Sequence, residues 1–113
     1  MNGTVIFVAS DRLGEGDPEL GAALMLAALK NLPKTGDEPP THLLFMNAGA
    51  KLCCEGSAAL ADLRALADAG AELLVCGTCL DWFDLKERLA VGRESNMVEI
   101  LRTQREAARV LRL

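Results

Sequence analysis

The stretch AELLVCGTCLDW, residues 71–82, places a strand pattern directly before two cysteines. Its first six residues are apolar apart from Glu72, as expected for a strand in a parallel sheet that is covered on both faces. Two similar runs precede it, TVIFVA at 4–9 and THLLFM at 41–46. The sequence therefore predicts at least three separated strands of one parallel sheet.

Helical segments lie between these runs. Asp17 is an expected N-cap, and Pro18 follows at the first helical position of a helix that extends to about Asn31. This helix is apolar on nearly every face, so we expect one face to pack on the sheet and another on a second subunit. A second helix is expected from Ser57, its cap, to Gly70, which ends it.

The C-terminal third continues the alternation. A short helical piece is predicted at 80–89, and Asn96 with Glu99 three residues later forms a capping-box pattern for a last helix. ARVLRL, residues 108–113, is predicted as a fourth strand. Strands that alternate with helices predict an α/β fold of three layers, with four to five parallel strands and helices on both faces. The commonest small arrangement gives the strand order 2-1-3-4.

Length and composition limit the class of protein. The chain has 113 residues, half of them hydrophobic, so residues 1–113 are predicted to form one domain with a genuine core. The formal net charge is −4, and the basic residues are scattered except for a group on the last helix and strand, so nucleic acid is not an expected partner. No run is long enough to span a bilayer, and no signal peptide is recognisable. We expect a cytoplasmic protein with no membrane partner.

In a reducing compartment four free cysteines indicate redox, sulfur or metal chemistry. Cys76 ends the third strand, and Gly77 and Thr78 are expected to turn their backbone amides toward its sulfur. Cys76 is then a candidate nucleophile and Cys79 a candidate resolving thiol for a persulfide or mixed disulfide. No cofactor is indicated by any motif, since Gly14, Gly16 and Gly21 do not fit a dinucleotide-binding pattern.

Other interpretations of the cysteines remain open. Both thiols of the CGTC segment are small enough to be buried hydrophobic residues without chemistry. Cys53 and Cys54 together with the CGTC pair would supply four thiolates to zinc, although adjacent cysteines seldom reach one metal, and no metal is predicted. General disulfide exchange and a non-catalytic module that binds a small ligand or a protein are further alternatives. His42 is expected to be structural.

Three segments together resemble a known family: VASDRLGEGDPELG, FMNAGAKLCCEGS and GAELLVCGTCLDWFDLKERLAVGRESNM. They are similar to the DsrE-like domain of the YedF-type sulfurtransferase-like selenium metabolism proteins, within the wider DsrE/DsrF-like family. The resemblance covers essentially the whole chain. It implies a flavodoxin-like fold, a homo-oligomer, and relay of sulfur or selenium through a persulfide on a cysteine.

By this resemblance Cys76 corresponds to the persulfide cysteine and Cys79 to the second cysteine of the motif. Binding positions are implied in the second-strand loop and in a later short motif: Asn47, Gly49, Lys51, Glu55, Gly56 and Asn96. The implied partner is a TusA-like sulfur-carrier protein or a small sulfur or selenium donor. The chain departs from the YedF-type pattern in starting directly with the first strand and in carrying Cys53 and Cys54.

Overall fold

The computed structural model describes residues 3–113. Five strands form one parallel sheet: β1 (Thr4–Val8), β2 (His42–Phe45), β3 (Glu72–Cys76), β4 (Arg93–Ser95) and β5 (Arg109–Arg112). Four α-helices accompany them: α1 (Pro18–Asn31), α2 (Leu60–Asp68), α3 (Gly77–Trp82) and α4 (Met97–Glu106). Three short 3₁₀ segments lie in the connections: η1 (Leu32–Lys34), η2 (Asn47–Cys53) and η3 (Lys86–Arg88). The predicted three-layer α/β architecture of flavodoxin-like type is confirmed.

The predicted strand order 2-1-3-4 is wrong, because the observed order is β4-β3-β2-β1-β5. The chain adds β2, β3 and β4 in one direction, and the segment predicted as the fourth strand returns as β5 to the other edge of β1. There Phe7 of β1 is paired with Arg112 of β5. The prediction also omitted β4, whose three residues include no apolar side chain.

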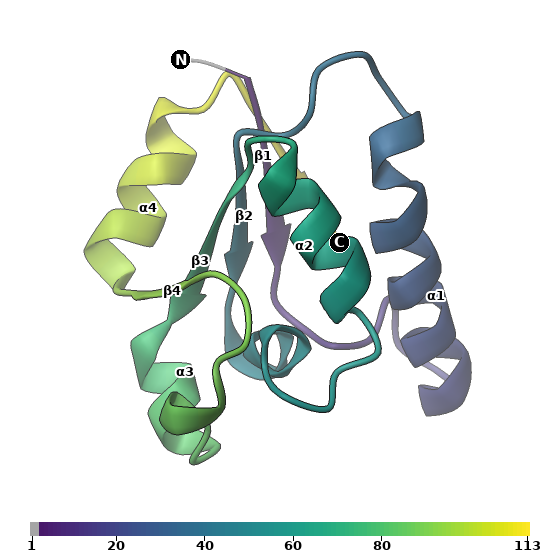
Figure 1. The fold of residues 1–113 in the computed structure, drawn as a ribbon, viewed down its shortest axis with the longest axis vertical. Coiled ribbons are helices and arrows are strands. Elements are labelled where there is room, and N and C mark those ends of the chain that lie inside the picture. Colours follow the sequence, from purple (N-terminus) through teal and green to yellow (C-terminus); the bar gives the residue numbers. More distant parts are fainter. Residues whose placement is uncertain (1–2) are drawn as a thin grey trace.

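The strand order determines which helices cover which face. Right-handed crossovers that proceed in one direction place their helices on one face, and a crossover in the opposite direction places its helix on the other. Accordingly α1 and α2 lie on one side of the sheet and α4 on the other (Figure 1). Met25 and Leu63 belong to the core on the first side, whereas Ile100 packs against Val5 and Leu74 on the second.

Local signals located the starts of α1 and α4, whereas Ser57, expected to cap the second helix, instead accepts a hydrogen bond of 3.0 Å from Ala59 N, and α2 begins at Leu60. The Asp17 side chain accepts a hydrogen bond of 2.9 Å from Leu20 N at the start of α1, and the Asn96 side chain accepts one of 2.9 Å from Glu99 N at the start of α4. Residues 47–53, predicted as a loop, instead form the 3₁₀ segment η2. The helical piece expected at 80–89 is divided into α3, which already begins at Gly77, and η3.

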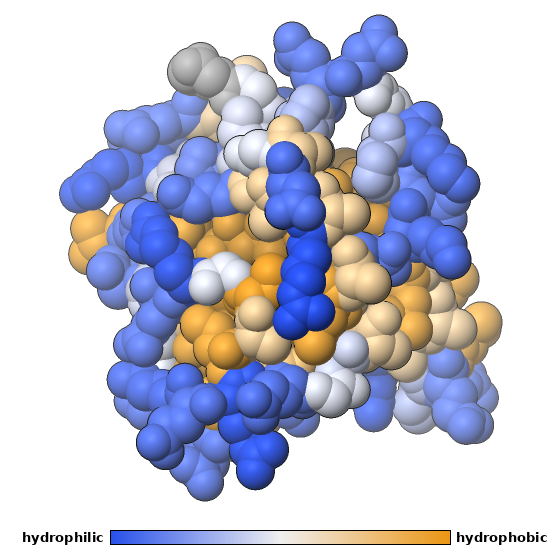
Figure 2. All heavy atoms as spheres, in the orientation of Figure 1, coloured by the Kyte–Doolittle hydropathy of each residue, from blue (hydrophilic) through white to orange (hydrophobic). Residues whose placement is uncertain are grey.

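The outer face of α1 is partly apolar, as its sequence predicts. Leu20 and Leu24 are 58% and 43% exposed, while Met25 on the sheet side is completely buried. Figure 2 shows apolar surface over the middle of the face that carries α1 and α2, crossed by one hydrophilic strip and bordered by hydrophilic side chains. No helix within residues 3–113 is long and apolar enough to cross a membrane.

Candidate functional site

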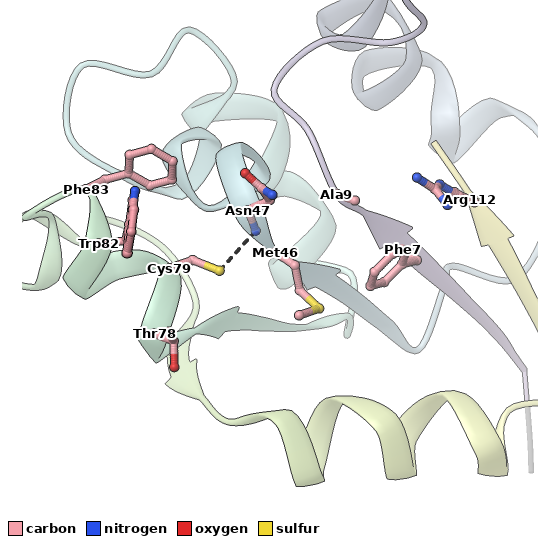
Figure 3. A pocket seen from close by; sticks show the side chains of 9 residues that line it. All are labelled: Phe7, Ala9, Met46, Asn47, Thr78, Cys79, Trp82, Phe83 and Arg112. Carbon is pink, nitrogen blue, oxygen red and sulfur yellow. Dashed lines mark hydrogen bonds between the residues drawn. The ribbon is translucent and has the colours of Figure 1, made fainter.

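A cavity of about 520 Å³ opens at the carboxyl edge of the sheet. Sheets of this class bind ligands at that edge, and the volume lies in the range of small-molecule sites. Figure 3 shows side chains from β1, β5, the end of β2 and α3 around it. The nine lining residues are Phe7, Ala9, Met46, Asn47, Thr78, Cys79, Trp82, Phe83 and Arg112.

Cys79 lies on one wall of this cavity and is held there by the chain that leaves β2. The backbone N–H of Asn47 donates a hydrogen bond of 3.0 Å to Cys79 Sγ, drawn as the dashed line in Figure 3. Asn47 adopts a left-handed conformation with φ of 52°, which asparagine tolerates better than most residues. Its side-chain oxygen also accepts a hydrogen bond of 2.9 Å from Ala48 N, which stabilises the turn.

Cys76 lies behind this wall. It is the last residue of β3 and is only 3% exposed, within the core that also contains Val5, Leu44 and Ile100. Cys79 is partly exposed and lines the cavity. The two thiols interact, and both are free. A molecule in the cavity therefore meets Cys79 before Cys76, whereas the sequence-based prediction gave Cys76 the role of attacking thiol.

The surroundings of Cys79 favour the protonated thiol. Burial raises its pKa most, the hydrogen bond with Cys76 raises it further, and the Asn47 N–H opposes both effects by lowering it. The net result is a pKa above the ordinary value for cysteine. Since the thiolate is the nucleophile, reactivity at neutral pH depends on what else stabilises the anion.

Arg112 brings the only charge among the nine described residues that line the cavity. Its guanidinium lies over the ring of Phe7, with Cζ 6.0 Å from the ring centroid. Figure 3 shows Arg112 on the side opposite Cys79, with Phe7 and Met46 between them. The sequence alone does not single out this residue, because its position depends on the pairing of β5 with β1.

Several residues implied by the resemblance lie elsewhere at the same edge. Lys51, Glu55 and Gly56 line a second hollow of about 340 Å³, beside α1. The Lys51 ammonium lies over the ring of Phe83, 4.4 Å from its centroid. Gly49 is buried against the end of β1, where an added Cβ would lie 2.3 Å from the carbonyl oxygen of Val8.

Of the other predicted binding residues, one lines the cavity and two belong to the scaffold. Thr78 lines the cavity. Gly77 is buried next to the Glu94 side chain, whose Oε2 would lie 2.6 Å from an added Cβ. Asn96 caps α4 through the hydrogen bond from Glu99 N. The Glu94 side chain is about half exposed and free to move, so this approach alone does not require glycine at position 77.

The other cysteines and the histidine belong to the scaffold. Cys53 and Cys54 are buried in the core beneath α1 and α2, and burial raises the pKa of both thiols. His42 lies 3.8 Å from a carboxylate oxygen of Glu72, at the opposite end of β2 from the cavity. Among residues 3–113, no group of three or more His, Cys, Asp and Glu side chains is placed to hold a metal ion.

Comparisons with known proteins establish the fold. No protein-family model matches the chain, and no curated protein matches it. The crystal structure of the YchN protein from E. coli is similar over 98% of this chain and 99% of its own, with a TM-score of 0.73 and 18% identity. The structure of MTH1491 from Methanobacterium thermoautotrophicum, a protein of unknown function, is similar over 97% of both chains, with a TM-score of 0.65 and 19% identity.

Proposed function

We propose that this protein carries sulfane sulfur as a persulfide on the CGTC thiol pair. The observation that carries the proposal is the position of Cys79, which faces an open cavity while Cys76 lies directly behind it. None of the described residues that line the cavity is a histidine or a carboxylate able to act as a general acid or base, so thiol chemistry is the chemistry that these residues support best. The resemblance to the DsrE-like domain of YedF-type proteins favours the same function.

The proposed first step is a thiol exchange. Cys79 attacks the outer sulfur of a persulfide donor, R–S–SH. The S–S bond of the donor breaks, its electron pair leaves with R–S⁻, and that thiolate takes up the proton that Cys79 gives up. Cys79–S–SH and R–SH result, without net oxidation or reduction. The Asn47 N–H, 3.0 Å from the sulfur in the free protein, is placed to stabilise negative charge that forms there.

Two routes lead onward from this persulfide. An acceptor thiol, including one on a TusA-like carrier protein, takes the outer sulfur by the same exchange. Alternatively, Cys76 attacks Cys79 Sγ, which forms a disulfide between them and releases hydrogen sulfide. This second route needs an external thiol reductant to restore the two cysteines. The assignment expected from sequence, Cys76 as carrier and Cys79 as resolving thiol, is the competing order.

Intact-mass measurement after anaerobic incubation with inorganic polysulfide tests the proposal. We expect one labile sulfur adduct on the wild type and on Cys76→Ala, and none on Cys79→Ala. Cys54→Ala is the matched control, because it removes a buried thiol outside the cavity. An adduct lost only in Cys76→Ala would support the order expected from sequence. No adduct on any folded form would overturn the carrier function and leave a ligand-binding module as the better account.

Selenium is tested at the same thiol. Selenodiglutathione would transfer its selenium with one glutathione to Cys79 and release the other glutathione. The resulting adduct differs in mass from a sulfur adduct. The selenium function implied by the resemblance would be supported if selenodiglutathione forms an adduct that requires Cys79 and does so faster than it reacts with free cysteine. A reaction no faster than that of free cysteine would count against the selenium function.

We further propose that the protein self-associates through the outer face of α1. Leu20 and Leu24 stand one helical turn apart and are both well exposed. Exposed apolar surface is typical of interfaces between subunits, and Figure 2 shows apolar surface on the face that carries α1 and α2. Sedimentation at micromolar concentration should show an oligomer that Leu24→Glu reduces in size, while Leu101→Glu on α4 does not. A wild-type monomer would contradict this proposal.

A further inference from the structure

We propose that the cavity binds an organic persulfide whose acidic group stands several carbons from its sulfane sulfur, with the acid at Arg112 and the sulfur at Cys79. This inference rests on the proposed function in one respect, namely that the bound molecule is the sulfur donor. The binding of a small apolar anion by this cavity stands on its own observations.

The first observation is the separation of the two polar ends. Cys79 Sγ accepts its hydrogen bond from Asn47, just beyond the end of β2, whereas Arg112 ends β5. β1 lies between these strands, so their backbones are two strand spacings apart, or roughly 9–10 Å. A ligand such as thiosulfate is too small to reach both ends. A ligand with a short carbon chain is long enough to do so.

The second observation is the surface between the ends. Phe7 and Met46 lie between Cys79 and Arg112, and Trp82 and Phe83 stand at the Cys79 end (Figure 3). These side chains offer apolar contacts and no hydrogen-bond partner to a polar chain, apart from the indole N–H. The middle of the ligand is therefore expected to be a hydrocarbon chain, whose transfer from water to this surface is favourable.

The third observation is the charge of Arg112. No ion pair joins its guanidinium to a carboxylate within residues 3–113, while Arg88 and Arg93 each have such partners. A guanidinium binds a carboxylate or sulfonate through two parallel hydrogen bonds. It would attract the acidic end of the donor and orient the sulfane sulfur toward Cys79.

Binding is measured first, with ligands that carry no sulfur. Trp82 is the only tryptophan of the chain and lines the cavity, so its fluorescence reports occupancy directly. Hexanoate should bind more tightly than acetate, which lacks the chain, and than 1-hexanol, which lacks the charge. Arg112→Gln should weaken hexanoate binding about tenfold or more, because a charged hydrogen-bond partner is lost. The affinity of Arg112→Lys for hexanoate should lie between those of the wild type and Arg112→Gln.

Arg102→Gln is the matched control, because it removes the same charge from the exposed side of α4. Its affinity for hexanoate should stay within about twofold of the wild type, as expected for a screened surface charge. Equal loss of affinity in both variants would show that only net charge matters and would overturn the inference. Equal binding of hexanoate and 1-hexanol would overturn it as well.

Sulfur transfer is measured second, with the persulfides of 6-mercaptohexanoate and 6-mercapto-1-hexanol as matched donors. We expect the acidic donor to load Cys79 faster, and Arg112→Gln to abolish the difference. Equal loading by the two donors would overturn the inference and leave the carrier function intact. Binding of hexanoate through Arg112 without loading by either donor would overturn the carrier function and leave the anion site standing.

Discussion

The backbone N–H of Asn47 and the sulfur of Cys79 join the end of β2 to α3 by a hydrogen bond of 3.0 Å. Asn47 has a left-handed conformation, with φ of 52°, at the point where the chain leaves β2. Thirty-two positions separate the two residues in sequence. The geometry of the candidate site is therefore a product of the sheet and not of the CGTC segment alone.

Asn47→Gly and Asn47→Ala separate the conformation from the side chain. Both variants lose the hydrogen bond between the Asn47 side chain and Ala48 N, but only alanine is strained at a φ of 52°. We expect Asn47→Ala to be less stable than Asn47→Gly by about 1 kcal/mol. Urea unfolding measures the difference. Equal stability of the two variants would mean that the chain relaxes out of the left-handed conformation.

Thiol accessibility gives a second prediction. Iodoacetamide should modify Cys79 first in the native protein and Cys76 much more slowly, because Cys76 is only 3% exposed. Peptide mass mapping after short exposures measures the order. The rate at Cys79 should continue to rise with pH beyond 9.0, the ordinary pKa of the thiol, since the folded protein raises that pKa. Faster labelling of Cys76 would contradict the placement of the two thiols.

Much of the fold follows from local signals. Asp17 with Pro18 and Asn96 with Glu99 are capping patterns that act within one turn of helix, so sequence alone located α1 and α4. The strand order does not follow from such signals, because it depends on which distant segments pair. β4 was missed for a related reason: it is a short edge strand whose polar residues have no periodic apolar pattern.

The candidate site was likewise only partly predictable from local sequence signals. The cysteines were identified from their spacing, and their place at the carboxyl edge of β3 followed from the alternation of strands and helices. Arg112 belongs to the basic group on the last helix and strand, and nothing in its local sequence distinguishes it from the other arginines there. It enters the cavity because β5 pairs with β1 in a register that sets Arg112 beside Phe7. The relative exposure of Cys76 and Cys79 likewise depends on how α3 and α4 pack.

Gly49 is predicted to be essential for the junction between β1 and η2. An added Cβ would lie 2.3 Å from the Val8 carbonyl oxygen, which belongs to backbone and has little freedom to move. Gly49→Ala should lower the free energy of unfolding by about 1–3 kcal/mol, as overpacking does. Gly36→Ala is the control, because a Cβ added there would have no neighbour within 4 Å, and it should change stability by about 0.5 kcal/mol at most. Similar effects of both substitutions would argue against close packing at Gly49.

Lys51 is predicted to stabilise the structure and to leave the cavity unaffected. Its ammonium lies 4.4 Å from the Phe83 ring centroid, and it lines the hollow beside α1 instead of the cavity. Lys51→Met should reduce stability by about 0.5–1 kcal/mol and leave hexanoate affinity within about twofold. Lys34→Met, with the same loss of charge, should leave stability nearly unchanged. A large loss of hexanoate affinity in Lys51→Met would instead support the binding position that the resemblance implies for Lys51.

The ion pair between Arg93 and Glu99 predicts a dependence of stability on acidity. Hydrogen bonds from Arg93, and then from Ser95, hold the pKa of Glu99 at about 2, below its ordinary value of 4.5. A group with a lowered pKa stabilises the folded state fully above its unfolded pKa and loses that effect as the pH falls toward its folded pKa. The contribution of Glu99 should therefore be complete above about pH 4.5 and disappear between there and about pH 2.

Glu99→Gln tests this dependence, since it removes the charge and keeps the backbone N–H that Asn96 caps. The variant should be less stable than the wild type at neutral pH, and the two should converge as the pH falls from about 4.5 to 2. Urea unfolding across this range measures both. Glu38→Gln, on the loop before β2, is the control with the same loss of charge and should show no such convergence. A difference between Glu99→Gln and the wild type that stays constant down to pH 2 would show that the carboxylate contributes through packing and not through its charge.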